Sequence, residues 1–230
     1  MIKLPFFTSI GLVFLLFTTN LAFAQELFLY KKIDTTQLFM EVHYSEQIKP
    51  EKDYPALVFF FGGGWNSGSR AQIEPQAAYF AKRGMVCFLV DYRTKKQHQT
   101  SPYESVSDAK SAIRYLRKNA GKYHIDPDKI IASGGSAGGH LAAATALVKG
   151  YNDPGDDVNF SAIPNALVLF NPVIDNGPGG YGYERIGKQF VNFSPMLNIH
   201  AGAPPTLFLQ GTKDKLIPVV TAQYFQMVME

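Results

Sequence analysis

The feature that most constrains the fold is the segment IASGGSAGGHLAAA, residues 131–144, in which glycines surround Ser136. β-forming residues precede this serine and helix formers follow it, so we expect a strand that turns directly into a helix. Such a turn strains the backbone of its central residue, and glycines two positions to either side avoid the collisions that side chains would cause. The pattern predicts that the Ser136 hydroxyl stands above a sheet, at a helix N-terminus that favours negative charge. The alternative is an ordinary Gly-Ser loop, but the flanking patterns favour a nucleophile.

Short apolar runs alternate with helical patterns along the rest of the chain. This alternation predicts an α/β fold with a mostly parallel central sheet and helices on both faces. The 230 residues, 46% of them hydrophobic, suit one domain with a sizeable core. The predicted strands are 27–33, 38–44, 56–61, 85–90, 129–132, 166–170 and 206–210. The predicted helices are 75–83, 103–119, 140–149 and one that begins at 221.

Residues 1–24 have the pattern of a secretory signal peptide. Lys3 precedes an apolar run over residues 10–17, and Ala22-Phe23-Ala24 forms a small-x-small cleavage site. A membrane anchor is the alternative, but a spanning helix needs ~20 apolar residues. We therefore expect a mature domain of residues 25–230 that is secreted or periplasmic, with no stable membrane association after cleavage.

Composition excludes several classes of function. The net charge is only +3 and no basic stripe occurs, so nucleic-acid binding is not expected. The single cysteine, Cys87, lies in an apolar run and is interpreted as a packing residue. No His, Cys, Asp or Glu cluster has metal-ligand spacing, and no glycine-rich loop carries the lysine of a nucleotide site, so we expect no cofactor or metal.

A second glycine run supplies the donors that a serine nucleophile requires. Phe61-Gly62-Gly63-Gly64-Trp65 follows the predicted strand 56–61. Glycines let the backbone approach a substrate closely, so the amides of Gly63 and Gly64, with that of Ala137, are the predicted oxyanion hole. The alternative is a flexible glycine loop. Trp65 is predicted to line the substrate pocket or, equally, to anchor the loop.

These motifs together resemble the α/β-hydrolase superfamily, and more closely the secreted esterases of the hormone-sensitive-lipase-like and feruloyl/acetylxylan esterase-like groups. The resemblance covers roughly residues 54–220 and departs at Phe61, where the family usually has a loop-bracing histidine. It implies hydrolysis of short acyl esters, such as acetyl or feruloyl groups on polysaccharides or small alcohols, and a structural role for Arg93 and Asp108. The matching segments are Gly62 to Trp65, Asp91-Tyr92-Arg93, Gly134 to Leu141, and Gly211-Thr212-Lys213-Asp214.

The resemblance also implies a catalytic acid and a base. Asp214 follows the predicted strand 206–210 and is the predicted acid, which would orient a histidine; Asp175, one strand earlier, is the alternative. The expected order is serine, acid, histidine, yet no histidine follows Asp214 in the sequence. A crossover and a further strand need more residues than remain, so we expect the base, with the last strand and helix, beyond residue 230. The five histidines present, interpreted as structural, are His43, His98, His124, His140 and His200.

Three further expectations follow. Without its base, the 230-residue form should hydrolyse esters poorly and expose an apolar sheet edge. The irregular segment 177–187 should shape the substrate entrance. The alternatives to an esterase are a catalytically dead fragment or binding protein with a hydrolase fold, and a serine peptidase of the same fold.

Overall fold

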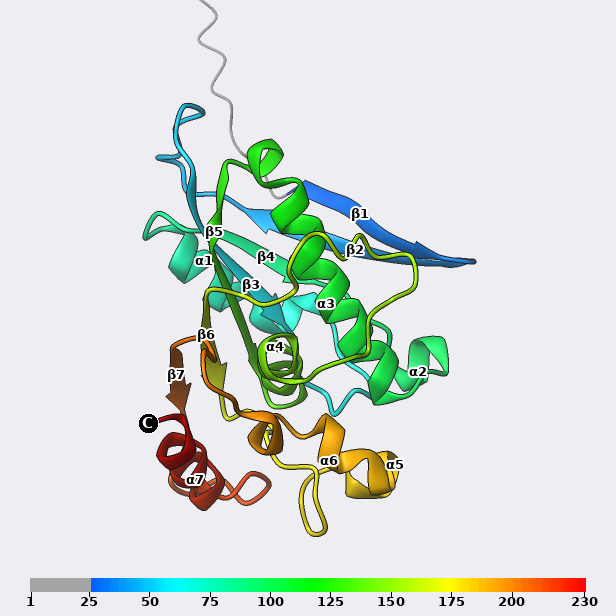
Figure 1. Cartoon of the computed structure of the whole chain (residues 1–230). Coiled ribbons are helices and arrows are strands. Elements are labelled where there is room, and N and C mark those ends of the chain that lie inside the picture. The colour runs from blue at the N-terminus through cyan, green and yellow to red at the C-terminus, as the bar shows by residue number, and fades with distance from the viewer. Residues whose placement is uncertain (1–25) are drawn as a thin grey trace, which may run out of the picture.

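The computed structural model describes residues 26–230, so the predicted signal peptide, residues 1–24, lies outside the described residues. The described part forms a sheet in the order β1-β2-β4-β3-β5-β6-β7 (Figure 1). The first two strands pair antiparallel as a hairpin, β2 pairs antiparallel with β4, and every pairing from β4 to β7 is parallel. The predicted mostly parallel sheet is therefore confirmed. The strands are β1 (Glu26–Ile33), β2 (Thr36–His43), β3 (Tyr54–Phe60), β4 (Val86–Val90), β5 (Ile125–Gly135), β6 (Ala166–Phe170) and β7 (Thr206–Leu209).

Helices cover the sheet and match the predicted helical segments. The helices α3 and α4 pack on each other and on β5, whereas α1 packs on β4, and Figure 1 shows α3 and α4 side by side in front of the sheet. The four long helices are α1 (Glu74–Ala81), α3 (Pro102–Lys118), α4 (Ala137–Leu147) and α7 (Val219–Met229). Short helical turns fill the loops: α2 (Lys95–His98), α5 (Tyr183–Ile186), α6 (Phe190–Phe193) and the 3-10 turns Arg70–Ile73, Ala120–Tyr123, Gly187–Gln189 and Pro195–Asn198.

Strand β5 begins earlier than the sequence pattern indicates. Tyr54 of β3 pairs with Ile125, but Ala56 pairs with Ile130, so the residues between form a bulge. Pro127 lies in this bulge, where its missing N–H breaks no ladder bond. The polar bulge explains why the pattern placed the start of the strand at residue 129.

The centre of the sheet is buried on both faces. Every residue of β4 is buried, as expected for a strand covered by helices on either side. Cys87 within it is fully buried, and burial raises the pKa of its thiol to about 12. The thiol is therefore protonated at neutral pH, and the interpretation of Cys87 as a packing residue is confirmed.

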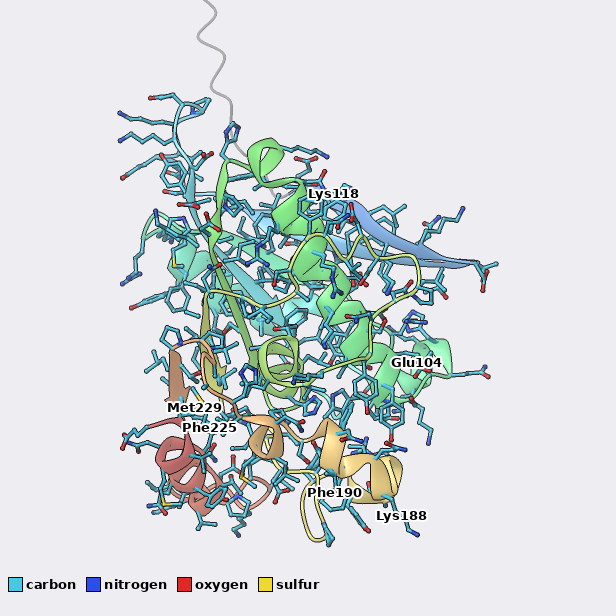
Figure 2. The ribbon with its side chains drawn as sticks, viewed as in Figure 1. Glu104, Lys118, Lys188, Phe190, Phe225 and Met229 are labelled. Atoms are coloured by element: carbon cyan, nitrogen blue, oxygen red, sulfur yellow. The ribbon has the colours of Figure 1, made fainter. Side chains whose placement is uncertain are left out.

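At the β7 edge of the sheet, β7 and α7 are less buried than the central strands. Phe208 of β7 packs on Phe225 of α7, with ring centroids 5.5 Å apart, and Figure 2 shows Phe225 and Met229 on the side of α7 nearest β7. Leu207 and Leu209 of β7 are exposed, as expected for an uncovered apolar edge. No helix in residues 26–230 has the length and apolar character needed to cross a membrane.

A buried charge cluster connects the segment after β4 to α3 and β1. The fully buried carboxylate of Asp108 accepts hydrogen bonds from the backbone N and Nε of Arg93, at 2.9 and 2.8 Å, and from Nζ of Lys31 at 2.8 Å. The structural role expected for Arg93 and Asp108 is thus confirmed. The cluster fixes where the chain leaves β4.

Replacing Asp108 with Asn should strongly destabilise the protein. The change leaves the largely buried Arg93 without its counter-charge, whereas Lys31 keeps Asp153 at 2.7 Å. Removing one partner of a buried pair typically costs about 3–5 kcal/mol of unfolding free energy. Urea denaturation of the Asp108→Asn variant measures this loss. The control is Asp157→Asn, which removes an exposed pair with Lys118 and should change little. Equal, small losses in both variants would contradict the structural role.

Candidate active site

Ser136 occupies the tight turn that the glycine pattern predicted, between β5 and α4. Its backbone has φ +54° and ψ −120°, a region that residues with side chains rarely adopt and that costs of order 1–3 kcal/mol. A β-carbon at Gly138 would lie 2.0 Å from the carbonyl oxygen of Phe60, and one at Gly134 would lie 2.5 Å from the same oxygen. Both positions therefore require glycine, because α4 and β5 meet the end of β3 at backbone contact distance.

Three backbone hydrogen bonds hold this turn. The Ser136 amide donates to the carbonyl of Phe170 at the end of β6, at 3.0 Å. The Ser136 carbonyl accepts from the amides of His140 and Val173, at 3.0 and 3.1 Å. The side chain is only partly buried, and Ala137, the next residue, begins α4 with a free amide. The serine thus lies at a helix N-terminus within reach of solvent.

The glycine run after β3 lies directly beside the serine. A β-carbon at Gly62 would be 3.5 Å from Cβ of Ser136. Gly63 and Gly64 have φ of +127° and +62°, and the Gly63 carbonyl accepts from the amides of Asn66 and Ser67 in a tight turn. Within the described residues, the amides of Gly63 and Gly64 donate to no protein acceptor. The structure therefore places Gly62, the residue before Gly63 and Gly64, beside Ser136, which Ala137 follows directly.

Phe61 holds the start of this loop without a histidine. Its ring stacks on Tyr92 with centroids 4.1 Å apart, and the Tyr92 hydroxyl donates to the Phe61 carbonyl at 2.8 Å. The next amide, of Gly62, donates to Oε1 of Gln72 at 2.5 Å. Aromatic stacking and two hydrogen bonds thus brace the loop at the position where the resembling enzymes usually have histidine.

The irregular segment 177–187 packs over the other side of the loop. Arg185 donates from Nη1 to the carbonyl of Gly64 at 2.5 Å, and a β-carbon at Gly64 would lie 2.6 Å from the Tyr181 hydroxyl. Tyr103 of α3 in turn donates to the carbonyl of Ile186 at 2.9 Å. Sequence reasoning placed Tyr181 in the irregular segment but missed its contact with the loop and that of Arg185, because no local pattern indicates a contact over a hundred residues away. It also missed Gln72, ten residues after Gly62, because a side-chain bond to a backbone amide leaves no sequence pattern.

Trp65 is an anchor of the loop that also borders a cavity. The side chain is 1% exposed, and its ring packs edge-on against His140 at 4.9 Å and against Phe193 at 6.2 Å. It also forms part of the wall of a cavity next to the loop. Trp65 therefore has both features expected from the sequence, since it anchors the loop and borders a cavity.

His140 is a core residue on α4. The ring is fully buried, stacks on Phe193 and lies with Nε2 3.2 Å from the Phe193 carbonyl. Burial lowers the pKa of His140 to about 3, so the imidazole is neutral at physiological pH. Its backbone amide donates to the Ser136 carbonyl, but its ring is not hydrogen-bonded to Ser136.

Asp214 lies in the turn after β7. Its Oδ1 accepts from the amides of Leu216 and Ile217, at 2.9 and 3.0 Å, and its Oδ2 accepts from Gln210 at 3.3 Å. Hydrogen bonds from Ile217 and Leu216 hold the pKa of Asp214 below its usual value, so the carboxylate is ionised. Asp214 and Ser136 follow the carboxyl ends of parallel strands, where sites of such sheets form, but no hydrogen bond joins them.

No histidine of the described chain, which contains all five, is hydrogen-bonded to the Ser136 or Asp214 side chain. His43 pairs with Glu41, His98 accepts from the amide of Thr94, and His200 contacts Ala201. His124 precedes β5, at the opposite end of that strand from Ser136. Among the residues that the structure describes, the side chain of the alternative acid, Asp175, accepts a hydrogen bond only from the amide of Gly177, at 2.8 Å. In residues 26–230, no group of His, Cys, Asp or Glu side chains is arranged to hold a metal ion.

The mostly parallel sheet, the strained serine turn and the adjoining glycine loop define an α/β-hydrolase fold. The chain belongs to the BD-FAE family, whose model matches residues 40–177. The structure of Thermogutta terrifontis esterase 2 phosphoramylated by tabun is 44% identical, with a TM-score of 0.85 over 89% of this chain and 78% of that one.

Curated relatives are more distant. Esterase LipC of Mycobacterium tuberculosis is 32% identical over 76% of this chain and 48% of its own length. An acetylxylan esterase of Xylanibacter ruminicola is 29% identical over 74% of this chain and 36% of its own length. The chain spans about half the length or less of these relatives. The resemblance to the α/β-hydrolase superfamily and its esterases is confirmed.

His140 should make folding stability depend on pH. Its pKa is about 3 in the folded protein and ~6.5 in an unfolded chain, so between these values the unfolded state binds one more proton. Stability from this group is therefore lost as pH falls below ~6.5, by ~1.4 kcal/mol per pH unit.

Urea denaturation at pH 7.5 and pH 5 checks this dependence. Between the two, the His140→Gln variant should lose ~2 kcal/mol less unfolding free energy than the parent chain. The exposed His200→Gln change serves as the control and should leave the pH dependence as it is. Identical losses in the parent and the His140 variant would show that burial does not keep this imidazole neutral.

Proposed function

We propose that this chain is a carboxylic ester hydrolase that forms an acyl-enzyme on Ser136. The observation that carries the proposal is the strained Ser136 turn, partly open to solvent and beside the unoccupied amides of Gly63 and Gly64. An ordinary loop would pack equally well with less backbone strain. The tight turn and the free amides therefore indicate a function other than packing. The esterases among its relatives support the same reaction.

The proposed reaction has two halves. Oγ of Ser136 attacks the acyl carbon, and the carbonyl oxygen becomes an oxyanion that the amides of Gly63, Gly64 and Ala137 stabilise. The bond from the acyl carbon to the alcohol oxygen then breaks, and the alcohol leaves with the proton that the serine gave up. Water attacks the acyl-enzyme in the same way, which releases the acid and restores the serine.

Both halves need a base, and Asp214 is the proposed acid that orients it. Its ionised carboxylate at the carboxyl end of β7 suits that role. None of the five histidine side chains, all of which lie within residues 26–230, is hydrogen-bonded to Ser136. The expectation that the catalytic histidine follows residue 230 stays a prediction.

We further propose short acyl esters as substrates, with acetyl or feruloyl groups on polysaccharides or small alcohols. The acetylxylan esterase relative and a Thermogutta terrifontis esterase 2 structure described as butyrate bound support short acyl groups. Secretion or export to the periplasm is proposed from the pattern of residues 1–24 alone. The small net charge supports no nucleic-acid partner.

Chemical rescue tests the nucleophile and the base separately. The 230-residue protein should hydrolyse p-nitrophenyl acetate slowly, because no imidazole reaches Ser136, and added imidazole should raise the rate in a saturable way. The Ser136→Ala variant should show only the rate of imidazole in solution.

Two outcomes would contradict the proposal. Equal rates for the parent and the Ser136→Ala variant with imidazole would exclude the serine as nucleophile and favour a binding protein with a hydrolase fold. Fast hydrolysis by the parent without imidazole would show that the missing-base interpretation is wrong. Acetylation of Ser136, measured by mass spectrometry after trapping at low pH, provides an independent reading.

A further inference from the structure

A cavity of about 590 Å³ lies against the glycine loop and has no part in the proposed reaction. Three separate segments form it: the residue that ends the glycine run, the stretch from α2 to the start of α3, and α5. Its volume falls in the range of ~300–1,000 Å³ typical of sites for small organic ligands, so it is large for a simple inorganic ion. Its lining includes Trp65, Lys95, Gln99, Thr100, Ser101 and Arg185.

The cavity is positively charged. Lys95 and Arg185 line it, and no Asp or Glu is among its lining residues. Within residues 26–230, Lys95 has no ion-pair partner, and Arg185 pairs only with Glu184, a carboxylate that is 72% exposed. Water screens such an exposed partner, so both cations remain available to an anion inside the cavity.

The acidic group on the neighbouring helix is already engaged. Glu104 lies in the first turn of α3, near α2 (Figure 2). Its Oε2 accepts from the amide and the hydroxyl of Ser101, at 2.9 and 2.5 Å, in a capping box. Its charge therefore stabilises the helix N-terminus, and within the described residues Glu104 forms an ion pair with neither Lys95 nor Arg185.

The polar atoms of the wall are mostly donors in need of an acceptor. Nε1 of Trp65 and Oγ1 of Thr100 are buried and have no hydrogen-bond partner within the described residues. Indole, ammonium and guanidinium groups can only donate, and a buried donor without a partner costs free energy. A ligand that brings several acceptor oxygens and a negative charge would satisfy this wall.

The cavity and the glycine loop share two contacts. Arg185 donates to the carbonyl of Gly64 at 2.5 Å, and the amide of Lys95 donates to the carbonyl of Trp65 at 3.0 Å. The cavity therefore adjoins the end of the loop that carries the candidate oxyanion amides.

We propose that this cavity binds the carboxylate of an acidic sugar in the alcohol part of the ester substrate. The two carboxylate oxygens can accept from the Lys95 ammonium and from Nη2 of Arg185, since Nε and Nη1 of Arg185 already donate to Glu184 and to the Gly64 carbonyl. The sugar ring has the size that the cavity accommodates, and Gln99 and Ser101 provide polar groups for its hydroxyls. The evidence for carboxylate binding comes from the cavity itself. The role of the cavity in substrate recognition, by contrast, rests on the proposed esterase function.

The sole tryptophan of the chain lines the cavity, so its fluorescence reports binding without any need for catalysis. Titration of the 230-residue protein with methyl α-D-glucuronide, as the sodium salt, should change the Trp65 emission in a saturable way. The neutral methyl α-D-glucoside should cause no change, and added salt should weaken binding of the glucuronide.

Two lysine variants then locate the site. Lys95→Met should raise the dissociation constant of the glucuronide about tenfold, as expected for the loss of one charge-assisted hydrogen bond. Lys96→Met removes the neighbouring lysine, which does not line the cavity, and should leave the constant unchanged. Equal effects of the two changes would overturn the proposal.

Other results would also overturn it: no emission change with glucuronide, equal binding of the neutral glucoside, or sulfate binding as tightly as glucuronide. These readings do not depend on Ser136. Glucuronide binding in a chain that shows no serine-dependent hydrolysis would therefore contradict the proposed function and leave the carboxylate site in place.

Discussion

The contact between the first turn of α4 and the end of β3 determines the geometry of the whole site. Gly138 approaches the carbonyl of Phe60 so closely that a single β-carbon would overlap it. This approach forces the chain to turn sharply at Ser136, which raises the serine off the sheet. The same contact places the start of the glycine loop beside Ser136, because that loop continues directly from β3. The proposed nucleophile and the start of the glycine loop thus lie next to each other as a consequence of one backbone contact.

The loop itself depends on the surrounding chain for its shape. Positive φ values at Gly63 and Gly64 give it the freedom to turn its amides outward, but freedom alone does not fix a conformation. Tyr92 and Gln72 hold its start, while Arg185 holds the Gly64 carbonyl from the opposite side. With the backbone fixed from both sides, the amides are oriented before any substrate binds, which is the condition for effective oxyanion stabilisation.

Local sequence patterns predicted the fold and the turn at Ser136. They did not predict the contacts between segments that are far apart in the sequence. The turn at Ser136 was predictable because its steric requirement is met by residues within two positions of it. The alternating strands and helices were predictable from the burial of continuous apolar runs such as β4. By contrast, the bracing by Arg185 joins segments far apart in sequence, and the bulge at Pro127 depends on the register of β3. The cavity beside Trp65 could not be predicted either, because it forms only where three loops meet.

The central claim is that Ser136 is a nucleophile facing the amides of the glycine loop, and a crystal structure after reaction with an organophosphonate tests it most directly. The account predicts a covalent bond from phosphorus to Oγ of Ser136, with the phosphoryl oxygen within hydrogen-bonding distance of the amides of Gly63, Gly64 and Ala137. Phosphorus bound to another side chain, or a phosphoryl oxygen directed away from these amides, would contradict it.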